Sequence, residues 1–131
     1  LHDLPQTRFV ADFIGEANVL PCEVVSAGAG DEPAMIKLGS LNLQTNACDS
    51  TAAQRHVAVR PNRVSLQAAG SPNTLEATVQ KATYVGEQME YMVHSALGEL
   101  FITSSDTDNP IAAGSPVALG FGVGDVVLLR D

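Results

Sequence analysis

Hydrophobic and polar residues alternate with a period of two over most of the chain after residue 17. Leu20 and Cys22 alternate with Pro21 and Glu23, and similar short segments recur between turn-forming residues further along. A period of two is typical of strands with one face buried. About eight or nine short strands at this spacing predict an all-β fold, a small barrel or sandwich rather than a parallel sheet. The segments are 18–25, 34–45, 55–66, 75–86, 89–96, 98–105 and 116–131.

Turn residues divide these segments in a way that predicts their connections. Gly39 and Ser40 separate two strands within 34–45, and Pro61, which has no N–H to donate, should end a strand at Arg60. Gly86 and the "ALGE" step separate three strands that should form a meander over 75–105. The last segment should hold two strands on either side of a glycine-rich turn.

A helical period appears only near the N-terminus. Phe9, Val10, Phe13 and Ile14 form one apolar stripe, and Gly15 stands where a helix usually ends. A helix of about two turns is marginal in water and requires a packing partner. Helix gives way to strand near residues 16–18, which places a boundary between 1–17 and 18–131.

Composition and charge exclude several classes of protein. The 131 residues suit one domain, and no apolar run approaches the length of about 18 residues that a membrane span needs. The net charge of −8 disfavours nucleic acid as a partner. Cys22 and Cys48 lack zinc-ligand spacing, so two free buried thiols are favoured and a disulfide stays open. The absence of both an initiator Met and a signal peptide suggests an excised piece of a longer protein.

Motifs for chemistry are mostly missing. No GxxxxGK[ST] phosphate-binding loop is present, so we expect no catalysis and no ATP binding by this chain. The glycines of "GFGVGD" at 120–125 lead into a predicted strand, which favours a turn over a nucleotide loop. "DTDN" at 106–109 lacks the glycine and glutamate that a calcium loop needs further on. His2, His56 and His94 lie on separate segments, and no metal site is predicted.

Three stretches carry a resemblance to a known family. "TRFVADFIGEANVLPCEV", "HVAVRPNRVSL" and "TVQKATYVGEQMEYMV" resemble, in this order, the C-terminal part of ATP-binding subunits of ABC importers. The resemblance implies that residues 1–17 are the last helix of an ATPase domain and 18–131 an OB-fold-like regulatory domain, the TOBE domain. Arg60, Pro61 and Gly86 match family motifs, whereas Asn62 replaces the glutamate of the family's R-P-E.

The function implied by the resemblance is regulatory and not catalytic. ATP and Mg would bind in the ATPase domain of the parent, so no cofactor is expected in this chain. Its implied partners are a second copy of itself, that ATPase domain and the permease subunits. The stripe Phe9, Val10, Phe13 and Ile14 would be the contact with the ATPase domain or with the second copy. The implied location is the cytoplasm, at the inner face of the plasma membrane. The motifs look most like the spermidine/putrescine type.

Two alternatives stay open at this stage. The domain could itself sense the transported solute, whether polyamine, ferric iron or phosphonate. A polyamine would need several carboxylates on one cleft, for which Glu87, Glu90 and Glu99 are the candidates. The other alternative is an unrelated β-barrel binding module.

Overall fold

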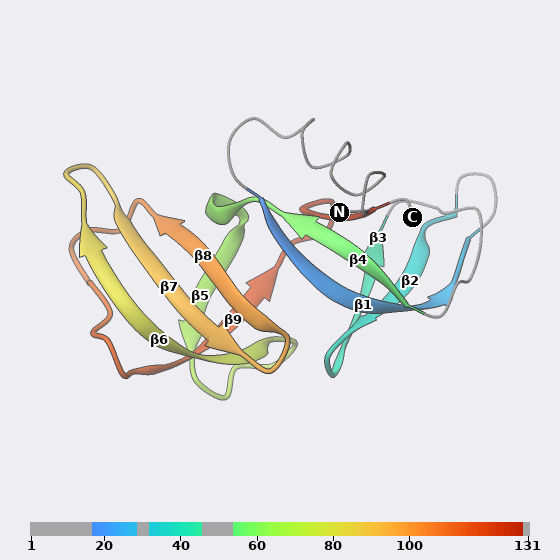
Figure 1. Cartoon of the computed structure of the whole chain (residues 1–131), viewed down its shortest axis with the longest axis horizontal. Helices are drawn as coiled ribbons and strands as arrows, with labels where there is room; N and C mark the ends of the chain where they lie inside the picture. The colour runs from blue at the N-terminus through green and yellow to red at the C-terminus, as the bar shows by residue number, and fades with distance from the viewer. Residues whose placement is uncertain (1–16, 29–31, 46–53, 130–131) are drawn as a thin grey trace, which may run out of the picture. The chain divides into compact units, whose positions relative to one another are not determined.

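The computed structural model describes residues 17–28, 32–45 and 54–129. They form ten strands and one 3₁₀ turn, so the predicted all-β fold is confirmed (Figure 1). The strands divide into two compact units. Unit 1 comprises the described residues up to Arg60 and from Gly122 onward, and unit 2 comprises Pro61–Phe121. The apolar stripe Phe9, Val10, Phe13 and Ile14, with its predicted helix, lies outside the described residues.

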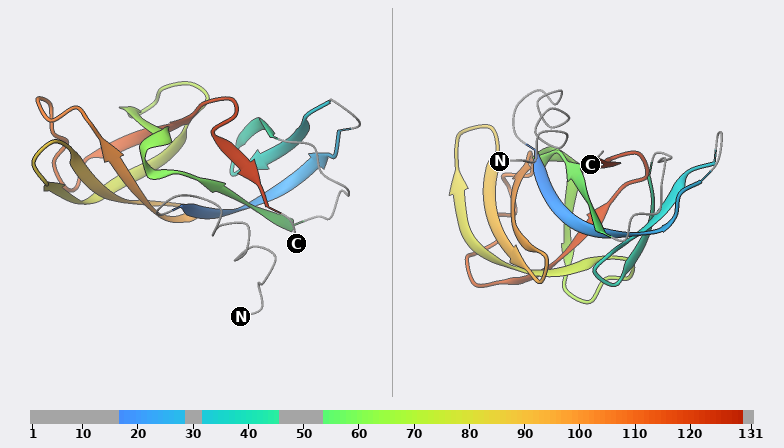
Figure 2. Two further views of the ribbon diagram at one scale, coloured as in Figure 1. Left: turned by 90° about the horizontal axis from the view of Figure 1, so that it is seen from above. Right: turned by 45° about the vertical axis from the view of Figure 1, so that its right-hand side comes forward.

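Unit 1 is a curled antiparallel sheet of five strands in the order β10-β4-β1-β2-β3 (Figures 1 and 2). Alternate residues of β1 are buried, as the sequence pattern predicts, and Leu20, Ile36 and Val57 lie in the core. The edge strands β10 and β3 come into contact, which closes the curl. The strands are β1 (Asn18–Ser26), β2 (Ala34–Leu38), β3 (Leu41–Thr45), β4 (Gln54–Val59) and β10 (Val126–Leu128).

Unit 2 is a second curled antiparallel sheet, in the order β5-β9-β6-β7-β8. Strands β6, β7 and β8 pair consecutively, so the predicted meander is confirmed. The core includes Val79, Tyr91, Val93 and Ile102. The elements are η1 (Pro61–Arg63), β5 (Val64–Ala68), β6 (Leu75–Tyr84), β7 (Met89–Ser95), β8 (Gly98–Ser104) and β9 (Pro116–Phe121).

A β-bulge interrupts the pairing of β6 with β7. Val79 pairs with Val93 and Lys81 pairs with Met92, so Gln80 is an extra residue on β6. Both Gln80 and Lys81 are exposed. Alternate residues are buried before the bulge, whereas after it Ala82 is half-buried and Tyr84 is exposed. Such an insertion increases the local twist of the sheet.

The two strands of the final predicted segment belong to different sheets. Strand β9 pairs with β5 and β6 in unit 2, whereas β10 pairs with β4 in unit 1. The glycine-rich turn between them is therefore a crossing between units and not a hairpin. In the described part of the chain, no helix is long and apolar enough to cross a membrane.

Candidate functional site

The family motif Arg60, Pro61 and Asn62 lies where the chain first passes from unit 1 to unit 2. Strand β4 ends at Val59, and the 3₁₀ turn η1 begins at Pro61. The strand thus ends one residue before the predicted Arg60, and Pro61 cannot extend it because proline cannot donate to a ladder. Turn η1 packs against β8 within unit 2. Arg60 and Asn62 are both exposed.

The fourth motif residue, Gly86, lies in the hairpin turn between β6 and β7. The N–H of Val85 donates to the carbonyl oxygen of Gln88 at 3.0 Å, which closes the turn. Gly86 has a φ of 94°, a conformation that side chains with a Cβ rarely adopt. Its role in the motif is therefore explained by backbone geometry.

The three candidate glutamates lie at different points of the β6–β7–β8 meander. Glu87 lies in the hairpin turn, whereas Glu90 and Glu99 lie on the outer face of β7 and β8. Glu90 pairs with Thr103, four residues along β8 from Glu99. At about 3.3 Å per residue, this separates the two positions by about 13 Å along the strands. Glu99 instead pairs directly with His94, a residue that the sequence did not single out for ligand binding.

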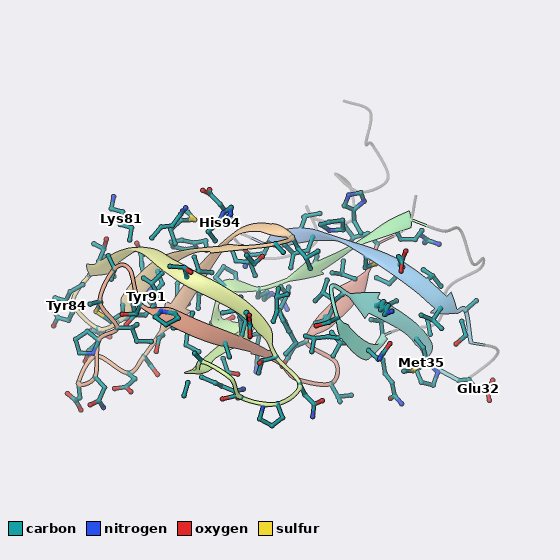
Figure 3. The ribbon with its side chains drawn as sticks, turned by 90° about the horizontal axis from the view of Figure 1, so that it is seen from below. Glu32, Met35, Lys81, Tyr84, Tyr91 and His94 are labelled. Carbon is teal, nitrogen blue, oxygen red and sulfur yellow. The ribbon has the colours of Figure 1, made fainter. Side chains whose placement is uncertain are left out.

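Side chains on the two faces of the unit 2 sheet have different surroundings. Lys81 and His94 project outward, whereas Tyr91 is 1% exposed and lies inside the curl (Figure 3). The backbone N–H of Ile111 donates to the Tyr91 hydroxyl at 3.0 Å. This bond ties the loop after β8 to the middle of the sheet.

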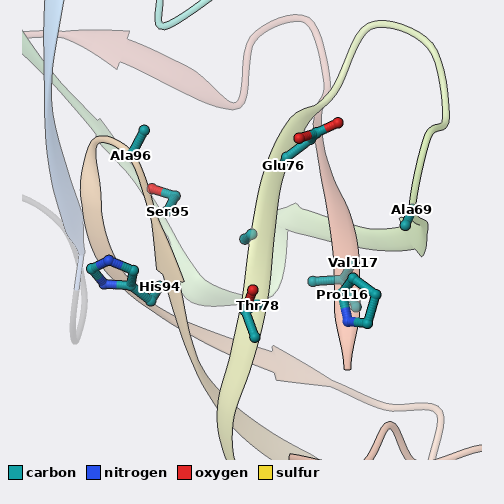
Figure 4. A pocket seen from close by; sticks show the side chains of 9 residues that line it. Ala69, Glu76, Thr78, His94, Ser95, Ala96, Pro116 and Val117 are labelled. Atoms are coloured by element: carbon teal, nitrogen blue, oxygen red, sulfur yellow. The ribbon is translucent and has the colours of Figure 1, made fainter. Parts of the chain in front are cut away.

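A hollow of about 340 Å³ lies over β6 in unit 2. Thr78 pairs with His94 on one side and with Pro116 on the other, and Glu76 lies further along the same strand (Figure 4). The Ser95 hydroxyl at its edge donates to the carbonyl oxygen of Gly98 at 2.8 Å and accepts from the N–H of Leu97 at 3.2 Å. Because this hydroxyl is committed to the β7–β8 turn, it is not presented to His94 as a nucleophile.

A second hollow in unit 2, of about 330 Å³, is lined by β5, the end of β8 and the loop that follows. Its lining includes Asn62, Ser65, Tyr91, Ser104, Asp106 and Asn109. The sequence drew attention to Asn62 and to the "DTDN" loop separately. Only the fold brings them to one place.

Two further candidates for chemistry are a metal site and the two cysteines. The residues that the structure describes contain no group of three or more His, Cys, Asp or Glu side chains placed to hold a metal ion. Cys22 is buried on β1, and Cys48 lies outside the described ranges.

Two curled antiparallel sheets of five short strands each define an all-β protein of the OB-fold-like class. Residues 57–129, more than half of the chain, match the family model of the TOBE domain. The chain belongs to the TOBE domain family, and the resemblance seen in the sequence is confirmed.

Curated relatives match over nearly the whole of this chain. The Fe(3+) ions import ATP-binding protein FbpC of Brucella abortus is 34% identical over 131 residues, which is 100% of this chain and 36% of the relative. FbpC of Agrobacterium fabrum is 35% identical over 92% of this chain and 33% of the relative. The spermidine/putrescine import ATP-binding protein PotA 1 of Pseudomonas aeruginosa is 31% identical over 100% of this chain. The chain spans about a third of the length of these relatives.

A solved structure shares the fold. The cytoplasmic molybdate-binding protein ModG, with molybdate bound, superimposes with a TM-score of 0.70 over 90% of this chain and 99% of that chain. The two sequences are 17% identical. At this identity, the likeness concerns the fold alone.

Proposed function

We propose that this chain is the C-terminal regulatory domain of an ABC importer ATP-binding subunit and has no catalytic role of its own. The similarity to importer ATP-binding proteins along the whole chain is the observation that carries this proposal. The absence of a phosphate-binding loop from the full sequence agrees with it. ATP and Mg would bind in the ATPase domain of the parent subunit.

The partners and location of the parent follow from the same proposal. The parent would pair with a second copy, associate with permease subunits and work at the cytoplasmic face of the plasma membrane. The apolar stripe Phe9, Val10, Phe13 and Ile14 would pack against the ATPase domain of the parent, because four large apolar side chains in water are unfavourable.

For the transported solute we propose ferric iron or a polyamine, and we place ferric iron first. The FbpC proteins of Brucella abortus and Agrobacterium fabrum are 34% and 35% identical to this chain, and PotA 1 is 31% identical. The sequence motifs alone favoured the polyamine type. The separation of Glu90 from Glu99 gives no support to a polyamine site formed by these two carboxylates.

An exchange experiment tests the proposal. The aligned third of Brucella abortus FbpC is replaced by this chain, and ferric iron uptake is measured in cells that lack their own FbpC. The same replacement in Pseudomonas aeruginosa PotA 1 is assayed for spermidine uptake. In a third hybrid, ModG replaces the aligned third of FbpC. This hybrid is the control for a domain that has the same fold but low sequence identity to this chain.

The hybrids distinguish the proposals. We expect iron uptake well above that of the ModG hybrid. Spermidine uptake alone would reassign the solute to the polyamine type. If neither hybrid exceeds the control although both accumulate as soluble protein, the chain is not an importer regulatory domain.

A further inference from the structure

The hollow beside β5 and the end of β8 is rich in unused hydrogen-bond donors. Five residues with hydroxyl groups line it, namely Ser65, Tyr91, Thr103, Ser104 and Ser105, and three of these hydroxyls each accept one hydrogen bond. Gln67 Nε2 donates to Ser65 Oγ at 2.9 Å, Ile111 N to Tyr91 Oη at 3.0 Å, and Asp106 N to Ser104 Oγ at 3.2 Å. A hydroxyl carries one proton and two lone pairs. None of the three donates a hydrogen bond to the described residues. Ser65 lies with Gln67 on the exposed outer face of β5, and Tyr91 is 1% exposed, so Ser104 is the one of the three that can offer its proton to a guest.

Two side-chain amides add to this set of donors. Asn62 on η1 and Asn109 in the loop after β8 both line the hollow and are exposed. Neither side chain makes a hydrogen bond to the residues that the structure describes. Each amide offers two donors and one acceptor. The hollow therefore presents donors from three separate segments of unit 2.

The charge of the lining limits what the guest can be. Asp106 is the only charged side chain in the lining, and no Lys, Arg or His accompanies it. An oxyanion would lie near this carboxylate without a cation, in a protein of net charge −8. A polyamine would find a single carboxylate among many donors. Neither charged class is complementary to the hollow.

An uncharged ligand with several hydroxyl groups fits the same lining. Its oxygens can accept from Ser104 and the two asparagines, and its protons can go to Asp106. The Oδ1 atom of Asp106 already accepts from Asp108 N at 3.2 Å and Asn109 N at 3.3 Å, which fixes the carboxylate and leaves Oδ2 for the ligand. A hollow of about 330 Å³ lies within the usual range for small-molecule sites. We propose that this hollow binds a small, uncharged polyhydroxylated ligand of the polyol or sugar class.

The departure of this sequence from its family motif contributes directly to the site. With Asn62, Asp106 is the only carboxylate in the lining. The glutamate of the family's R-P-E would add a second one. The amide also adds two donors where a carboxylate has none. The proposal concerns the lining of unit 2 and does not depend on which solute the parent transports.

Nuclear magnetic resonance titration of the full chain tests the proposal. The probes are myo-inositol and D-glucose as neutral ligands, and sodium sulfate, sodium molybdate and spermidine as charged ones. We expect saturable shifts of the amides of Ser65, Asp106, Asn109 and Ile111 with a neutral probe. The double variant Asn62→Ala, Asn109→Ala should weaken that binding by roughly tenfold or more, since it removes two donor groups.

A matched variant and the charged probes make the test decisive. Asn42→Ala removes the same group from an exposed position of β3 in unit 1, and should leave the affinity unchanged. The side chains of these two asparagines make no hydrogen bond to the described residues, so their loss should leave the spectrum of the core intact. Absence of saturable shifts with both neutral probes would overturn the proposal. Tighter binding of sulfate, molybdate or spermidine to the same amides would overturn the assignment to an uncharged ligand.

Discussion

The Nη2 atom of Arg55 on β4 donates a hydrogen bond of 2.9 Å to the carbonyl oxygen of Leu129, 74 positions along the chain. Both residues are buried, and the N–H of Leu129 donates to the carbonyl oxygen of His56 at 2.9 Å. Strand β10 pairs with β4 just before this point. The last described residues thus complete the sheet of unit 1 by main-chain and side-chain bonds together.

Replacing Arg55 by methionine should destabilise unit 1. Methionine keeps the apolar stem but leaves the buried carbonyl of Leu129 without its side-chain donor, at a cost of about 1 to 3 kcal/mol. Amide hydrogen exchange at Leu128 and Leu129 should accelerate correspondingly. Lys37→Met, at an exposed cation of β2, is the matched control and should change stability by less than about 0.5 kcal/mol. Equal effects of the two variants would contradict the proposed importance of the Arg55–Leu129 bond.

The variant Tyr91→Phe should loosen the loop after β8 without disturbing the core. The ring is 1% exposed and would keep its packing, while the N–H of Ile111 would lose its acceptor. We expect a loss of about 1 kcal/mol and faster exchange of the Ile111 amide. Exchange at Val93, in the same strand, serves as the internal reference and should remain slow.

Substitutions of Gly86 should follow backbone preference and not side-chain size alone. No atom lies within 4 Å of a Cβ built at this position, so the cost comes from its φ of 94°. Gly86→Val should cost about 1 to 3 kcal/mol, and Gly86→Asn should cost less because asparagine tolerates positive φ better. Urea unfolding monitored by circular dichroism measures both. A larger loss for asparagine would show that the turn has another constraint.

Gly28 and Gly120 should respond differently to alanine. At Gly28 a Cβ would contact the carbonyl oxygens of Glu32 and Pro33, which belong to the backbone, and φ is 75°. At Gly120 it would contact the ends of the Gln67 and Ser65 side chains, which can move. We expect a loss of about 2 kcal/mol for Gly28→Ala and well under 1 kcal/mol for Gly120→Ala. Thermal unfolding of the two variants gives the comparison.

The apolar stripe near the N-terminus predicts self-association of the isolated chain. Replacing Phe9 and Phe13 together by serine should shift the chain toward monomer in sedimentation, because clustered apolar surface drives association. The melting transition of the β-sheets should stay in place. An unchanged oligomeric state would show that the stripe is not the contact.

The sequence by itself determined the strands and many of their ends. Alternation marked the buried faces of β1, β2 and β7, because a strand with one face in the core must place apolar side chains at every second position. Gly39 and Pro61 marked strand ends through their backbone restrictions, and Gly86 marked a hairpin turn. These signals are local, so they can be read without knowing what lies across the fold.

Strand partners and site composition were decided only by the tertiary structure. Strands β9 and β10 follow one another in sequence yet pair in different sheets, because the pairing of each depends on partners far away in the chain. The candidate glutamates looked close in sequence, but the register places Glu90 and Glu99 at distant points of one face. Asn62, Tyr91 and Asn109 line one hollow only because η1, β7 and the loop after β8 converge there. Periodicity fixes which face a side chain occupies, whereas long-range pairing fixes its neighbours.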